Sequence, residues 1–226
     1  MKFFLDSAKL DEIDLAYGTF GIDGVTTNPR HVQNSGKPFK VVLRDISAWL
    51  AERKLSGWAQ FPISVEINPH LSTAADMVRE GKLFAAMNPC FVIKVPCTEA
   101  GLAASRLLER DGIRTNVTLV FSASQALPPA KNGALFVSPF IGWKEESGED
   151  TAQFLGDVVT VYRNYGFKTQ IIVAAVRNGK QIVEAARLGA DIVTAGLAVY
   201  QAAFEHPFTR KGLAIFQDAW DKTAPE

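Results

Sequence analysis

Lys94 is the residue in this sequence whose position most clearly calls for a chemical explanation. It lies inside the apolar run FVIKVP (91–96), which has the composition of a buried strand. Burial of an ammonium group is costly unless the charge is paired or the pKa falls. A desolvated lysine is partly neutral near pH 7, and the free amine can attack a carbonyl carbon to form a Schiff base. We therefore predict a nucleophilic lysine, with a structural ion pair to Glu66 as the alternative.

Two carboxylates interrupt similar runs. Glu66 lies within ISVEI (63–67), and Asp6 ends the run KFFLD (2–6). Carboxylates beside a buried lysine could move protons during carbinolamine formation and carbon–carbon bond cleavage. Taken singly, each could be a salt-bridge partner or a cap, and Asp6 could cap a helix that starts near Ser7. Together with Lys94 they predict an acid–base site.

Other runs end in polar or charged residues that could bind a substrate. Asn116 and Thr118 are two residues apart, so they point to one face of their strand. Asn28 precedes Pro29, which favours a turn, and an ordinary turn is the simpler interpretation of that motif. The remaining candidates offer hydroxyl groups or a cation: Thr26, Ser138 and Arg177.

These residues need a scaffold that brings them together. Eight short apolar runs begin near residues 2, 22, 61, 91, 114, 134, 170 and 191, at an average spacing of 27 residues. They lack the polar residues that a strand with one solvent-exposed face would carry at alternate positions, and helix-like segments separate them. This alternation predicts a single-domain (βα)₈ barrel, with its functional groups at the carboxyl ends of the strands. The alternative is an open doubly wound sheet, but no G-x-G-x-x-G motif follows an early run.

The helical segments carry their own boundary signals. Residues 98–110 begin with Thr98 as a predicted N-cap, and Gly112 follows as a stop. Residues 150–165 and 178–189 behave similarly. Within the domain 1–226, residues 207–226 form a predicted C-terminal helical extension, amphipathic over 210–220 and suited to packing on a neighbouring subunit.

Composition excludes several classes of protein. Lys+Arg and Asp+Glu both number 24, so neither nucleic acid nor an anionic membrane is an expected partner. No apolar stretch approaches the ~18 residues of a membrane span. The two cysteines, Cys90 and Cys97, suit a reducing compartment, and the acidic residue at position 6 does not fit a signal peptide. We therefore expect a cytoplasmic protein.

The three histidines show no spacing typical of a metal site. His31, His70 and His206 are scattered, and we interpret them as surface or loop residues. No metal or cofactor is therefore expected. Cys97, three residues after Lys94, is expected to be a bystander.

Ordered motifs along nearly the whole chain resemble the small transaldolase and fructose-6-phosphate aldolase family. They include IDGVTTNP, ISVEI, FVIKVPCTEAGLAA, GIRTNVTLVFSASQAL, VSPFIGW and IIVAAVRN. The resemblance implies a (βα)₈ barrel that forms a Schiff base with a ketose and needs no metal or cofactor. It also implies a homo-oligomer, a pentamer or a decamer, tied together by the C-terminal helix.

The resemblance also implies roles for individual residues. Lys94 would form the Schiff base, and Asp6 would take the proton from the C4 hydroxyl group. Glu66 would act through a water held with Thr118 during carbinolamine formation and dehydration. The hydroxyls of the dihydroxyacetone portion would be bound by Asn28, Asn116 and Ser138, with Thr26 close by.

Two positions separate the subfamilies. Glu66 and Phe140 are the residue types of the transaldolases, where the aldolases have Gln and Tyr. The resemblance therefore favours transfer of the dihydroxyacetone unit to an aldehyde such as glyceraldehyde 3-phosphate. An aldolase that releases free dihydroxyacetone is the alternative. A catalytically silent binding protein is disfavoured, because the predicted catalytic residues are all retained.

The expected phosphate pocket is altered. Trp143 stands where the family usually has Arg, and Ala175 stands where it usually has Ser, whereas Arg177 is retained. A phosphate monoester carries about −1.5 to −2 charges and favours several charge-assisted contacts. A singly charged sulfonate would tolerate one cation and an indole N–H better. We therefore favour 6-deoxy-6-sulfofructose as the donor, which would yield 3-sulfolactaldehyde.

An ordinary sugar phosphate, such as fructose 6-phosphate or sedoheptulose 7-phosphate, is the alternative donor. It requires another cation to replace the missing arginine, and the sequence offers Arg30 and Lys144. A neutral or uncommon ketose is a third possibility.

Overall fold

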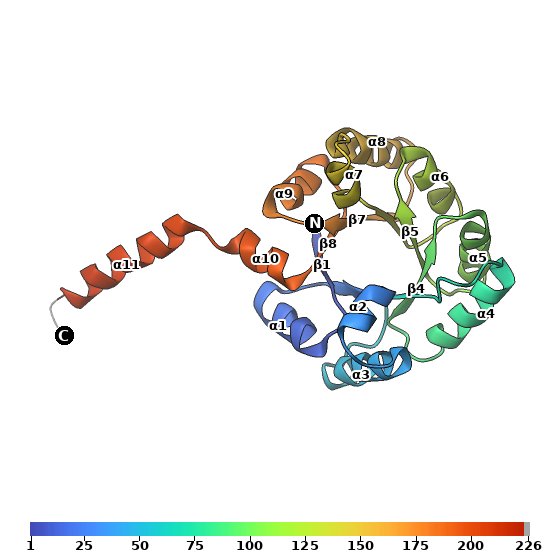
Figure 1. Ribbon diagram of the computed structural model, residues 1–226, viewed down its shortest axis with the longest axis horizontal. Helices are drawn as coiled ribbons and strands as arrows, with labels where there is room; N and C mark the ends of the chain where they lie inside the picture. Colours follow the sequence, from blue (N-terminus) through green and yellow to red (C-terminus); the bar gives the residue numbers. More distant parts are fainter. Residues whose placement is uncertain (224–226) are drawn as a thin grey trace.

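The chain folds into a closed barrel of eight parallel strands surrounded by helices, which confirms the predicted architecture (Figure 1). The computed structural model describes residues 1–223. Neighbouring strands follow chain order, and β8 pairs with β1 to close the barrel. The strands are β1 (Lys2–Asp6), β2 (Gly24–Thr26), β3 (Ile63–Glu66), β4 (Phe91–Pro96), β5 (Thr115–Val120), β6 (Phe136–Pro139), β7 (Gln170–Val176) and β8 (Ile192–Ala195).

Several of the helices begin at side chains that accept hydrogen bonds from their first N–H groups. Thr98, Asp150 and Asn178 are N-caps, as the sequence predicts for these segments. The first helix begins at Leu10, so the alternative in which Asp6 caps it is wrong. The helices are α1 (Leu10–Phe20), α2 (Pro29–Asn34), α3 (Phe39–Glu52), α4 (Ala74–Ala85), α5 (Glu99–Arg110), α6 (Ala123–Lys131), α7 (Gly142–Glu146), α8 (Thr151–Asn164), α9 (Gly179–Leu188), α10 (Leu197–Phe204) and α11 (Pro207–Asp221).

The barrel interior changes from apolar to polar along the strands. One buried cluster contains Phe4, Val92, Leu135, Phe136, Ile172 and Ile192. Because side chains alternate between the two faces of a strand, the residues two positions after Phe4, Val92, Phe136 and Ile192 share their faces. These residues are polar: Asp6, Lys94, Ser138 and Thr194. The apolar cluster therefore supports a polar layer nearer the carboxyl ends of the strands.

The C-terminal helix stands apart from the barrel. α11 begins three residues before the predicted amphipathic stretch, because His206 caps it and Pro207 occupies its first turn. None of its residues is buried, and the helix projects from the barrel in Figure 1. Residues 224–226 of the predicted extension lie outside the described residues. Within residues 1–223, no helix is long and apolar enough to cross a membrane.

Candidate active site

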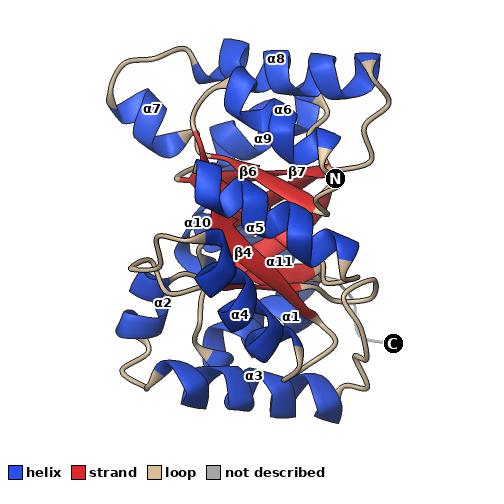
Figure 2. Ribbon diagram, turned by 90° about the vertical axis from the view of Figure 1, so that its right-hand side faces the viewer, coloured by secondary structure: helices blue, strands red, loops and turns tan. Residues whose placement is uncertain are grey.

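A cavity of about 580 Å³ lies at the carboxyl ends of the strands. Figure 2 shows α2 and α7 protruding from this same end of the barrel. The cavity wall gathers all of the sequence-predicted site residues except Asn116: Asp6, Thr26, Asn28, Arg30, Glu66, Lys94, Thr118, Ser138, Phe140, Trp143 and Arg177.

Lys94 is buried at this cavity and is paired. Its Nζ lies 3.0 Å from Glu66 Oε2 and donates a hydrogen bond to the carbonyl oxygen of Thr27 at 3.1 Å. Strand register explains the pairing, because Glu66 and Lys94 face each other on β3 and β4. The ion pair given as the alternative is therefore present. It does not exclude Lys94 as a nucleophile, because a carboxylate in contact with an ammonium group can also accept its proton.

Asp6 has a partner on each carboxylate oxygen. Thr26 Oγ1 donates to Oδ1 at 2.7 Å and also contacts the hydroxyl of Thr194, while His31 Nε2 lies 3.0 Å from Oδ2. Burial raises the pKa of Asp6, but His31, Lys94 and Thr26 outweigh it and hold that pKa below its usual value. Asp6 is therefore ionised at neutral pH. The interpretation of His31 as a surface or loop residue is wrong in placing it outside the site, because His31 lies on α2 and lines the cavity.

Asn116 lies behind the cavity wall. Its Oδ1 accepts a hydrogen bond from Ser138 Oγ at 2.8 Å, and its Nδ2 donates to Ser64 Oγ at 3.0 Å. This position does not fit the prediction that Asn116 binds substrate directly, because the residue is fully buried and holds Ser138 instead. Thr118, its neighbour on the same face, does line the cavity. Its buried Oγ1 has no hydrogen-bond partner among the described residues, so it is suited to hold a water or a substrate hydroxyl.

Asn28 combines two roles. Its Oδ1 accepts a hydrogen bond from the N–H of His31 at 3.0 Å, so the predicted turn at Pro29 is the capped start of α2. The residue also lines the cavity. The cap uses the amide oxygen only, and the amide nitrogen has no protein partner within residues 1–223, so it is available to a ligand.

Two strained backbone positions shape the cavity. Leu119 and Ala175 have φ values of 60° and 57°, at register shifts late in β5 and β7. Left-handed backbone costs about 1–2 kcal/mol for a non-glycine residue. Next to Ala175, a side chain at Gly142 would place its Cβ 2.1 Å from the Ala175 carbonyl oxygen. Glycine there lets α7 lie against β7 and brings Trp143 to the rim.

Aromatic rings form one side of the opening. The half-exposed Trp143 stacks on Phe121 with ring centroids 5.7 Å apart, and it meets Phe140 edge to face at 5.6 Å. Trp143 and Phe140 both line the cavity. This side is therefore apolar apart from the indole N–H.

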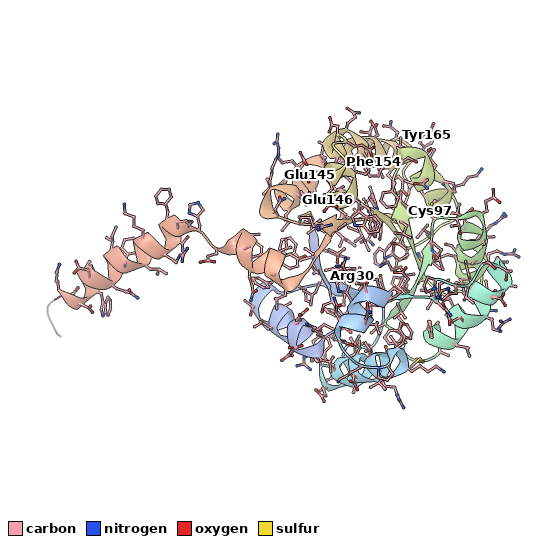
Figure 3. The ribbon with its side chains drawn as sticks, viewed as in Figure 1. Arg30, Cys97, Glu145, Glu146, Phe154 and Tyr165 are labelled. Atoms are coloured by element: carbon pink, nitrogen blue, oxygen red, sulfur yellow. The ribbon has the colours of Figure 1, made fainter. Side chains whose placement is uncertain are left out.

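The charges at the rim are unevenly paired. Arg177 Nη2 lies 2.8 Å from Glu146 Oε1. Lys144 pairs with Glu149 and does not line the cavity, so it does not replace the missing arginine. Arg30 does line the cavity, and it forms no ion pair within residues 1–223. Figure 3 shows Arg30 and Glu146 on facing sides of the opening.

The sequence of the chain agrees with the family resemblance. Residues 3–224 match the family model described as transaldolase/fructose-6-phosphate aldolase. The chain belongs to this family. Proteins named 6-deoxy-6-sulfo-D-fructose transaldolase from Priestia aryabhattai and Priestia megaterium are each 59% identical over 226 residues, covering 100% of this chain and 98% of theirs.

More distant family members also match over their full length. A probable transaldolase from Desulfatibacillum aliphaticivorans is 43% identical over 224 residues, or 99% of both chains. Among solved structures, 3-hexulose-6-phosphate synthase from Salmonella typhimurium has a TM-score of 0.62 at 16% identity, covering 90% of this chain and 92% of its own. That likeness concerns the barrel fold alone.

Proposed function

We propose that this enzyme is a transaldolase in which Lys94 forms a Schiff base with C2 of a ketose donor. The buried contact between Lys94 and Glu66 carries the proposal. Transfer of one proton to Glu66 leaves a neutral amine, which attacks C2 and forms a carbinolamine. Glu66 then returns the proton, through a water held with Thr118, to the carbinolamine oxygen, which leaves as water. The product is a protonated imine on Lys94.

Asp6 serves the next step as the base. It accepts the proton of the C4 hydroxyl group, and the electrons of that O–H bond form the carbonyl of the departing aldehyde. The C3–C4 bond breaks, and its electron pair enters an enamine on Lys94. The carbonyl carbon of an acceptor aldehyde then bonds to C3 of the enamine, and Asp6 returns its proton to the new hydroxyl group. Hydrolysis of the imine releases the product ketose.

Transfer is favoured over release by the apolar side of the cavity. Release requires protonation of the enamine at C3 by water, whereas Phe140 presents an apolar ring packed on Trp143. The 59% identical relatives are also named transaldolases. We therefore assign the enzyme to dihydroxyacetone transfer.

The first prediction separates transfer from release. With 6-deoxy-6-sulfofructose alone, we expect one 3-sulfolactaldehyde per active site followed by near arrest, because the enamine has no acceptor. Addition of glyceraldehyde 3-phosphate should restore steady turnover. A rapid-quench assay of the released aldehyde measures both phases.

Phe140→Tyr is the matched variant, since it adds only a hydroxyl group to the apolar wall. It should increase the rate of acceptor-independent release relative to transfer. Steady release of free dihydroxyacetone by the unmodified enzyme, at a rate equal to transfer, would show an aldolase.

The charges at the rim favour a singly charged donor head group. Arg30 forms no ion pair within residues 1–223, whereas Arg177 shares the rim with its partner Glu146, whose negative charge opposes binding of a dianion there. Trp143 can add one N–H donor but no charge. This arrangement suits a sulfonate better than a phosphate dianion, in line with the names of the 59% identical relatives. We propose 6-deoxy-6-sulfofructose as the donor.

The second prediction uses the pH dependence of phosphate charge. The second pKa of a phosphate monoester is about 6, whereas a sulfonate keeps one charge. The ratio of kcat/KM for fructose 6-phosphate to kcat/KM for 6-deoxy-6-sulfofructose should therefore rise by about five- to tenfold from pH 7 to pH 5.5. Ionisation of enzyme groups that changes kcat/KM equally for both donors cancels in this ratio.

Glu146→Gln tests the cause of this preference. Freeing Arg177 should raise the ratio at pH 7.5 and weaken its dependence on pH, while Glu149→Gln, which frees Lys144 outside the cavity, should leave the ratio unchanged. A ratio that is flat or falls between pH 7 and pH 5.5 in the unmodified enzyme would contradict the charge argument and favour a phosphate donor.

The exposed apolar side chains of α11 are best explained by contact with a second copy of the chain. Large apolar side chains on α11 are more than half exposed: Phe208, Leu213, Ile215, Phe216 and Trp220. Exposed apolar surface of this size is typical of interaction sites. We propose a homo-oligomer, a pentamer or a decamer by family resemblance, in which α11 packs on a neighbouring subunit.

The third prediction concerns this helix. Sedimentation should give several chains per particle for the unmodified protein and a smaller particle for the Phe216→Glu/Trp220→Glu variant, because charge opposes burial of the apolar side chains. Lys211→Glu, also on α11, changes charge without removing apolar surface and should keep the larger particle. A monomeric unmodified protein would overturn the proposal.

We also propose that the enzyme is cytoplasmic. Both cysteines are free thiols in the structure, and burial raises the pKa of Cys90 to about 11, which keeps it unreactive. Free thiols of this kind suit a reducing compartment.

A further inference from the structure

His31 contacts the proposed base but has no role in the mechanism above. Its Nε2 lies 3.0 Å from Asp6 Oδ2, and its side chain is about one quarter exposed. It is the third residue of α2, whose start is fixed by the Asn28 cap. The imidazole ring is therefore held by a rigid local structure at the edge of the cavity.

The contact completes the environment of the Asp6 carboxylate. Thr26 donates to Oδ1, and that hydroxyl is itself in contact with Thr194. Oδ2 has His31 as its only partner among the described side chains. Thr26 alone would leave the carboxylate free to turn about its bond to Cβ, whereas partners on both oxygens fix its plane.

The other charged groups of the cavity are engaged elsewhere. Lys94 and Glu66 pair with each other on β3 and β4, and Arg177, beyond β7, pairs with Glu146 of α7. Arg30 is next to His31 on α2 and forms no ion pair within residues 1–223. Asp6 on β1 is thus the one charged group within ion-pair distance of His31 in the described chain.

We propose that His31 is a positioning residue that keeps the Asp6 carboxylate oriented toward the C4 hydroxyl and in its ionised form. The proposal rests on the proposed transaldolase mechanism. His31 keeps its own N–H proton throughout: the proton of the C4 hydroxyl goes to Asp6, and the electrons move as described above. Cleavage and formation of the C3–C4 bond depend on His31, whereas Schiff-base formation at Lys94 does not.

The electrostatics of Asp6 support this division. Burial raises its pKa, and the hydrogen bond and charge of His31 are the main influences that lower it again, ahead of Lys94 and Thr26. Loss of His31 should therefore raise the pKa of Asp6. The acid limb of the pH profile for carbon–carbon cleavage would then move to higher pH.

The test compares His31→Leu with His31→Gln, whose amide can still donate to Oδ2. The donor is 6-deoxy-6-sulfofructose or fructose 6-phosphate, whichever the unmodified enzyme cleaves. Borohydride reduction and intact mass separate the uncleaved six-carbon adduct from the three-carbon adduct on Lys94.

In the unmodified enzyme the three-carbon adduct should dominate. In His31→Leu we expect the six-carbon adduct to accumulate and kcat to fall ten- to a hundredfold. The acid limb of its pH profile for carbon–carbon cleavage should move to higher pH. His31→Gln should recover part of kcat.

His70→Leu is the matched control, because His70 lies in an exposed loop and outside the cavity. It should behave as the unmodified enzyme. Equal losses of both adducts in His31→Leu, with no recovery in His31→Gln, would indicate a structural role and overturn the proposal. Turnover within twofold of the unmodified enzyme would also overturn it. Failure of the unmodified enzyme to form any adduct on Lys94 would instead disprove the proposed function.

Discussion

The pairing of Lys94 with Glu66 inside the barrel is the constraint on which the site depends. A buried ammonium group without a partner would destabilise the fold by several kcal/mol, so the chain must supply a carboxylate at a fixed place. Adjacent parallel strands in register supply it, because Glu66 on β3 faces Lys94 on β4. In the proposed mechanism the same contact gives the amine a proton acceptor. One pair of residues thus meets a requirement of stability and a requirement of the proposed Schiff-base chemistry.

The fold and most of the site follow from patterns that can be read along the chain. Short apolar runs with helices between them specify the barrel, and polar residues late in those runs mark the functional end. Lys94, Glu66, Asp6 and Thr118 break the apolar pattern, so their convergence could be predicted once the strands were closed in order. Thr194 is likewise a polar residue late in an apolar run, on β8, and could have been predicted for the same reason.

Other features depend on geometry that spacing does not encode. His31 reaches Asp6 only because Asn28 starts a helix directly after β2. Asn116 and Thr118 share a strand face, yet Asn116 is hydrogen-bonded to Ser64 and Ser138 behind the cavity wall. Lys144 follows Trp143 in sequence but turns away to Glu149. The bulges at Leu119 and Ala175 lie in runs whose composition is that of regular strands.

The central claim is that Lys94 becomes covalently attached to the donor, and it can be tested directly. The protein is incubated with 6-deoxy-6-sulfofructose, reduced with borohydride and analysed by intact mass and peptide mapping, with Lys94→Ala as the control. The account predicts a dihydroxyacetone-sized adduct on the peptide that contains Lys94 and none in the variant. Turnover of the donor without any adduct on Lys94, or an adduct that persists in Lys94→Ala, would contradict it.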